Sequence, residues 1–265
     1  MKPKLLVFLL FFVSSQFLAG HEFWIQPQRF HFNRGETVNL RFRVGENFEG
    51  ENWSGTKSGV KEISLFYDGM HDELLNLLSD STMGDSLSMQ FYDEGTVMVA
   101  YHSNNKYITL EPDKFLSYLK EDGLNNAITF REQHNETDSL GNEFYQRNVK
   151  SLVQIGTKKD STFKKPTGLP LDIIPLHHPY LLKKGQPLPI KVLFEKEPLA
   201  SQLVKVWHKK SGKVSMTDYT TNENGIVYVP VSLIGDYMFS TVRMSRIEND
   251  SAQWQSYWGS LTWGY

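Results

Sequence analysis

His21 is the residue whose position offers the most chemistry, because it directly follows a segment typical of a cleaved export signal. If cleavage follows Gly20, the mature chain begins at His21, and the α-amine and imidazole of this one residue can chelate one metal ion together. The α-amino pKa of about 8 lets a metal ion displace the amine proton readily. One more imidazole would complete a three-nitrogen ligand set suited to copper(II) or nickel(II).

Two further residues are the predicted partners of His21 in a metal site. His102 stands at the end of a predicted strand and would supply the second imidazole, and Glu22 would add an oxygen ligand. The chain contains no cysteine, so imidazole, carboxylate and backbone nitrogen are the ligands it can offer a transition metal. The alternative is that His21 is a solvated side chain that stands near a cleavage point by chance.

The other histidines give weaker signals. His31 alternates with Phe30 and Phe32, which predicts that its side chain faces solvent. His177 and His178 are adjacent on an extended segment, so their side chains should point in opposite directions and only one could join a site. The remaining ones have no partner at ligand spacing and are predicted at the surface: His71, His134 and His208.

Residues 1–20 have the three parts of a secretory signal. Lys2 and Lys4 precede an unbroken apolar run over residues 5–13, and Ala19-Gly20 supplies small residues before the cleavage point. The apolar run is shorter than the ~20 residues of a membrane-spanning helix. We therefore expect a soluble mature protein that works outside the cytoplasm.

Composition limits the classes of partner. The chain has 265 residues, 22% of them charged, with a formal net charge of −2, which provides no electrostatic attraction for nucleic acid or an anionic membrane. Aromatic residues make up 13% of the chain and favour strands. The sequence contains no Gly-x-Ser-x-Gly, P-loop or His-Glu-x-x-His motif, so we do not expect an enzyme.

The elements that must position these residues are mostly strands. Strict alternation of apolar and polar residues over 38–44, and similar patterns elsewhere, predict half-buried strands at intervals of about ten residues, as in a β-sandwich. A helical insertion is predicted over about 111–147. It opens at Glu111-Pro112-Asp113, continues over 125–134, and includes a possible helix over 143–147.

The segment 156–170 is charged and then rich in glycine and proline, which is typical of a boundary. The predicted fold class is mainly β, with two Ig-like β-sandwich domains and the helical insertion in the first. The predicted organisation is a signal at 1–20, an N-terminal β-rich domain at 21–160, and a C-terminal sandwich at 166–265 that is Ig-like or similar to carboxypeptidase-regulatory-like modules.

Several strings along the chain resemble the family called domain of unknown function 4198. They are HEFWIQP, FRVGENFEGE, LEPDKFLSYLKEDGL, KSLVQIG, GLPLDIIP with HHPYLLKKGQPLPI, and WQSYWGSLT. The resemblance implies an exported, Ig-like β-sandwich protein that often begins its mature form with histidine. It also implies a periplasmic role, because some members are described as components of nickel or cobalt uptake.

Together these observations predict an extracytoplasmic protein that binds nickel, cobalt or copper for uptake or sequestration. The expected partner is a metal-uptake permease or an outer-membrane receptor. An Ig-like adhesion or carbohydrate-binding module is the alternative, with the aromatic tail at 254–265 as a sugar platform, although a sandwich core also explains that tail. A hydrolase would rest on abundant carboxylates alone.

Overall fold

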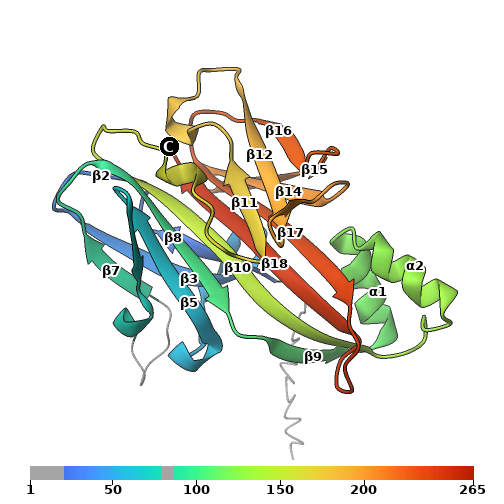
Figure 1. Ribbon diagram of the computed structural model, residues 1–265. Coiled ribbons are helices and arrows are strands. Elements are labelled where there is room, and N and C mark those ends of the chain that lie inside the picture. Colours follow the sequence, from blue (N-terminus) through green and yellow to red (C-terminus); the bar gives the residue numbers. More distant parts are fainter. Residues whose placement is uncertain (1–20, 79–85) are drawn as a thin grey trace, which may run out of the picture.

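The computed structural model describes residues 21–78 and 86–265. The predicted signal at 1–20 lies outside these residues. The described part of the chain is mainly β, as predicted, and its strands form a ten-stranded sheet with a four-stranded sheet on either side (Figure 1). Within it, no helix is long and apolar enough to cross a membrane.

The ten-stranded sheet, here called sheet B, is the centre of the molecule. Its longest member, β10, runs parallel to β18 and beside it, with Arg147 paired to Trp258. The strands of its main path, in spatial order, are β15 (Lys213–Thr220), β14 (Leu203–Lys210), β17 (Asp236–Arg246), β18 (Trp254–Gly264), β10 (Gly141–Ile155), β8 (Gly95–Ser103), β5 (Val60–Tyr67) and β6 (Met70–Glu73). Two more strands pair with β10, namely β2 (His31–Phe32) and β9 (Lys106–Leu110).

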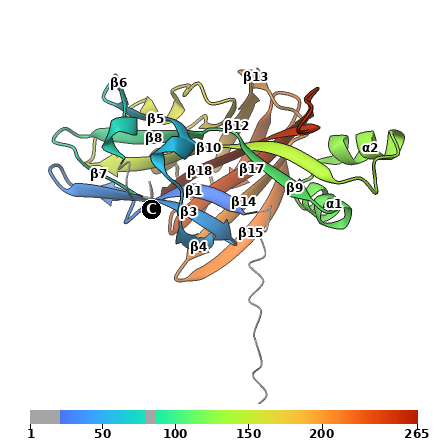
Figure 2. The ribbon, with the colours of Figure 1, turned by 90° about the horizontal axis from the view of Figure 1, so that it is seen from below.

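Sheets A and C cover the two faces of sheet B, and Figure 2 shows sheet A from below. Sheet A consists of β1 (Glu22–Pro27), β3 (Thr37–Glu46), β4 (Glu49–Asn52) and β7 (Ser86–Gln90). Sheet C consists of β11 (Leu171–Pro175), β12 (Pro187–Phe194), β13 (Glu197–Pro198) and β16 (Ile226–Pro230). Single 3-10 turns occupy the connections at Lys57–Gly59, Leu75–Leu77, Thr162–Lys164 and Pro179–Leu181.

Successive residues of sheet B enter different cores, which explains why β8 is buried along its whole length. Met98 and Ala100 pack into the core shared with sheet C. Val99 and Tyr101 pack into the core shared with sheet A. Because side chains alternate along a strand, the parity of a residue number on β8 or β10 decides which face its side chain occupies.

The predicted helical insertion is present, but it is shorter than expected. Helix α1 (Pro112–Glu121) and α2 (Asn125–Gln133) pack on β17 and β18 through a core that includes Trp254 and Trp258. The prediction of a helix over 143–147 is wrong. These residues belong to β10 and pair with β9 on one side and β18 on the other, and this pairing overrides the helical propensity of the segment.

Sheet B contains strands from both sides of the predicted boundary, because β10 lies before it in the chain and β18 after it. The division into residues 21–160 and 166–265 therefore describes the order of strands along the chain. As a division into separate folding units it stays a prediction, and so does the number of Ig-like units.

Candidate functional site

The first described residue, His21, is fixed in place by the strand that follows it. Strand β1 pairs with β3 from Glu22, opposite Gly45, and the carbonyl oxygen of His21 accepts a hydrogen bond of 2.6 Å from Nη1 of Arg147. Arg147 comes from β10, in the sheet beneath. The backbone at His21 is thus fixed by sheet A through the β1–β3 pairing and by sheet B through Arg147. The position from which the His21 side chain extends is therefore defined.

The His21 imidazole faces a carboxylate. Its Nε2 lies 3.3 Å from Oε1 of Glu46, at the end of β3, and the two side chains are 31% and 51% exposed. An acceptor beside Nε2 favours the tautomer in which Nε2 carries the hydrogen and Nδ1 keeps its lone pair. Nδ1 is the ring nitrogen nearer the backbone, so it is the one that can close a chelate ring with the α-amine of the same residue.

Glu22, the predicted oxygen ligand, is not brought to the His21 ring. Neighbouring residues of a strand point to opposite sides, and the Glu22 side chain is buried. It lines a small hollow of about 10 Å³ beside Asp122, Lys205 and Trp258. Burial raises the pKa of Glu22 to about 7, with Lys205 acting in the opposite direction.

His102, the predicted second imidazole, lies on the other face of sheet B. It shares the parity of Ala100, which packs toward sheet C, whereas Arg147 reaches toward sheet A and His21. Its Nε2 is hydrogen-bonded to Oε1 of Gln146, and it lines a separate hollow with Leu169 and other residues near sheet C. Burial lowers the pKa of His102. The structure therefore does not bring His102 and His21 together.

The donor set at His21 fits a partial metal site. Among residues 21–78 and 86–265, no group of three or more His, Asp or Glu side chains could jointly hold a metal ion. What the described chain offers is one imidazole with a carboxylate behind it, and a free amine if the chain is cut before His21. The amine and Nδ1 would fill two adjacent coordination positions of a tetragonal ion and leave its other positions open.

A buried network that the sequence analysis missed lies under helix α1. Glu143 of β10 is almost fully buried, and its Oε1 accepts hydrogen bonds from the hydroxyls of Tyr118 and Ser256. Trp258 donates its indole N–H to Oγ of Ser256 at 3.0 Å and stacks on the Tyr118 ring. Burial raises the pKa of Glu143 to about 7, against the opposing effect of these donors.

A buried ion pair adjoins this network. Nζ of Lys205, on β14, lies 2.7 Å from Oδ1 of Asp122, which follows the end of α1. Both side chains are buried, and burial raises the pKa of Asp122. Together with Glu22, these residues connect the start of β1, the end of α1 and strand β14. They therefore stabilise the position of the start of β1, which follows His21 directly. Their sequence positions gave no signal, because they are 83 to 183 residues apart.

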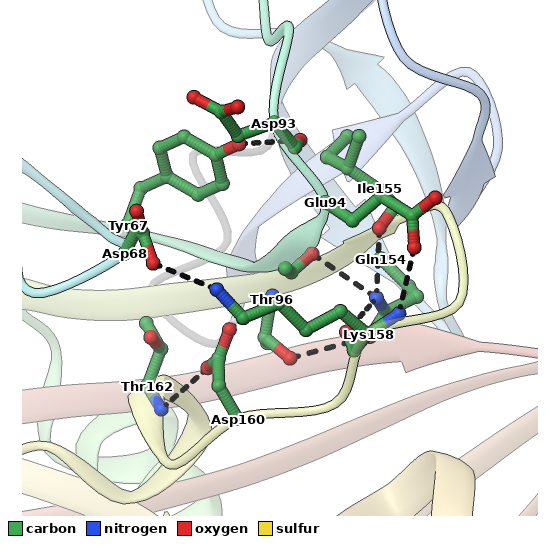
Figure 3. Close-up of polar contacts among 11 residues, drawn as sticks. Tyr67, Asp68, Asp93, Glu94, Thr96, Gln154, Ile155, Lys158, Asp160 and Thr162 are labelled. Atoms are coloured by element: carbon green, nitrogen blue, oxygen red, sulfur yellow. Dashed lines mark hydrogen bonds and ion pairs between the residues drawn. The ribbon is translucent and has the colours of Figure 1, made fainter.

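Histidines 177 and 178 have different environments, as predicted for adjacent residues. His178 is buried and its Nε2 lies 3.1 Å from Oγ1 of Thr96, while His177 is exposed. Figure 3 shows the surrounding contacts: Oδ2 of Asp160 accepts from the backbone N–H of Thr96, and Gln154 bonds within the same group. The predicted boundary segment at 156–170 is thus tied to β8 through Asp160 and to β10 through the Lys158 carbonyl by partly buried hydrogen bonds.

The aromatic tail belongs to the core. Trp254, Trp258 and Trp263 are each less than 9% exposed, and Trp263 stacks between Tyr237 and Phe239. These tryptophans cannot offer a flat face to a sugar, so the tail is not a carbohydrate platform. The sandwich-core explanation of the tail is confirmed.

The chain belongs to the family described as domain of unknown function (DUF4198), whose model matches residues 18–245. No curated protein matches it in sequence. Among solved structures, it is similar to a tetra-tandem repeat in the extending region of a large adhesion protein, with 11% identity and a TM-score of 0.21. That match covers 92% of this chain but 49% of the other, so this chain spans about half its length. It is also similar to three N-terminal domains of the bacteriophage RB49 outer capsid protein Hoc, with 7% identity, a TM-score of 0.22, and coverage of 91% and 70%.

Proposed function

We propose that this protein is exported and that its mature N-terminus binds nickel, cobalt or copper outside the cytoplasm, for uptake or sequestration. The ion would be held by the α-amine and Nδ1 of His21 after cleavage behind Gly20. The observation that carries the proposal is the 3.3 Å approach of Nε2 of His21 to the Glu46 carboxylate. A carboxylate behind the other ring nitrogen is the usual support of a metal-binding imidazole.

The fixed backbone of His21 adds to this support. Its carbonyl is held by Arg147 at 2.6 Å, and the next residue is already in the β1–β3 ladder. An anchored chain end keeps the amine and the ring within a small volume, so less conformational entropy is lost when the ion binds. The open coordination positions would accept water or a donor from a partner, which suits transfer to a permease or a receptor better than permanent storage.

The test is a calorimetric titration of nickel(II), cobalt(II) and copper(II) into the chain that begins at His21. We expect binding to at least one of these ions, and loss of that binding in His21→Ala and in a chain whose α-amine at His21 is acetylated. The matched control is His177→Ala, which removes an exposed imidazole elsewhere and should bind the ion as the parent does. Equal affinity in the parent, the acetylated chain and His21→Ala would refute the proposal.

Glu46→Gln separates support by the carboxylate from direct ligation. The amide keeps a similar shape but accepts the Nε2 hydrogen less strongly. We expect the ion to bind to Glu46→Gln with affinity reduced by about 10-fold to 100-fold, as for other residues that orient a metal-binding histidine. Unchanged affinity would show that Glu46 has no part in the site.

A further inference from the structure

A long polar groove lies on the outer face of sheet A, away from His102 and the sheet C hollow. Its volume is about 680 Å³, and it lies between β1, β3 and β7 on one side and the ends of β14 and β17 on the other. The groove forms because Trp24 and Phe48 of the first side pack against Trp207 and Met238 of the second. Sheet B thereby curls around the outside of sheet A.

The wall of the groove on sheet A carries neutral hydrogen-bonding side chains that orient one another. Nδ2 of Asn39 donates to Oε1 of Gln28 at 2.7 Å, and Oγ of Ser88 donates to Oδ1 of Asn39 at 2.9 Å. Nε2 of Gln28 donates to the backbone oxygen of Thr37 at 3.0 Å. These residues are exposed, and each amide keeps a second hydrogen or lone pair for a ligand.

An aromatic residue continues this row beyond the groove. Nε2 of Gln90 donates to Oγ1 of Thr37, and the Tyr92 hydroxyl donates to Oε1 of Gln90, both at 3.1 Å. Tyr92 is 69% exposed, although large aromatic side chains are usually buried. Its ring offers an apolar face next to a row of amides and hydroxyls.

The charges around the groove are nearly balanced. Arg41, Arg43 and Lys209 line it together with Glu49 and Asp236. Arg43 is engaged with the Asn52 side chain and the Gly50 carbonyl, whereas Arg41 is exposed and has no acidic partner among the described residues. A strongly anionic ligand such as nucleic acid would need a clear excess of positive charge.

We infer that this groove binds a neutral oligosaccharide in an extended form. Amide and hydroxyl side chains fixed in orientation are suited to sugar hydroxyls, which both donate and accept, and Tyr92 can cover the apolar face of a sugar ring. A peptide strand cannot be added to β3, the central strand of this wall, because β3 already pairs on both edges, with β1 and with β4 or β7. This site does not depend on the metal proposal.

The inference is tested with immobilised hexasaccharides of β-1,4-glucose, β-1,4-xylose, β-1,3-glucose and β-1,4-mannose, followed by calorimetry. We expect binding to at least one of them, weakened about tenfold or more in Asn39→Ala and in Arg41→Gln, because each removes about one hydrogen bond to the ligand and disturbs its neighbours. Gln133→Ala, which removes an exposed amide from α2, should bind as the parent does.

Thermal melting would verify that each variant is folded. Binding that persists with a chelator present, and in His21→Ala, would keep this site separate from the metal site. The inference is overturned if none of the four hexasaccharides binds, if both groove variants bind as tightly as the parent, or if the chelator abolishes binding.

Discussion

Glu143→Gln should change the free energy of unfolding in a way that depends on pH. The variant's value minus the parent's should be larger at neutral pH than at acidic pH. Glu143 is 2% exposed, and its Oε2 has no hydrogen-bond partner among the described residues, while Oε1 accepts from Tyr118 and Ser256. A buried carboxyl group in this setting holds its proton. Its pKa is about 7, against an ordinary value of 4.5.

The sign follows from proton binding. Between pH 4.5 and 7 the native state keeps the Glu143 proton and the unfolded state releases it, so stability falls as pH rises through this range. At about 1.4 kcal/mol per pH unit, the loss reaches about 3 kcal/mol by pH 7 and above. Glutamine keeps the shape and carries no titrating group, so Glu143→Gln escapes this loss.

The assay is urea unfolding followed by tryptophan fluorescence, at several pH values between 4 and 8. We expect the free energy of unfolding of Glu143→Gln, minus that of the parent, to rise with pH by up to about 3 kcal/mol. Glu132→Gln, at an exposed position of α2, is the control and should show no such trend. A difference that stays flat, or that falls as pH rises, would refute the reasoning.

Three further outcomes can be measured by the same unfolding assay. Asp122→Asn should lower the free energy of unfolding by about 3–5 kcal/mol, because it leaves the Lys205 charge buried without its partner. The double variant with Lys205→Met should recover part of this loss. A loss below about 1 kcal/mol would contradict the prediction. Burial lowers the pKa of His178 to about 4, so the parent loses stability as pH falls from 6.5 to 4. His178→Gln should remove this loss and make the protein less sensitive to acid. Equal loss of stability in the variant and the parent over this range would count against the prediction. Trp263→Ala should cost about 3–5 kcal/mol, since its ring is fully buried, and a neutral effect would argue against a core role for the tail.

The strand pattern of the fold could be predicted from the sequence where a strand has one buried face, as β3 of sheet A has along its first half. Val38, Leu40 and Phe42 are all buried, whereas Asn39 and Arg41 between them are exposed. Strand β10 was harder to predict. Its central residues are buried on both faces, so alternation is lost, and its neighbour β18 begins about 110 residues later in the chain.

The candidate site was predicted in part. His21 was chosen from its place after the predicted signal, and the His102 strand was expected. The face that His102 occupies could not be predicted, because it depends on how β8 is packed. Tyr101 is the neighbour that decides it, because its ring stacks near Phe23 in the core under sheet A and so turns His102 the other way. Glu46 gave no signal in the sequence, since its contact with His21 requires the β1–β3 register.

The central claim is tested most directly by electron paramagnetic resonance of copper(II) bound to the chain that begins at His21. With ¹⁵N introduced into histidine alone, our account predicts that nitrogen couplings of the bound ion change because the amine and Nδ1 of His21 are ligands. It also predicts that the copper spectrum changes when one alanine precedes His21, because the amine then belongs to another residue. A copper spectrum that is identical with and without the added alanine would contradict the account.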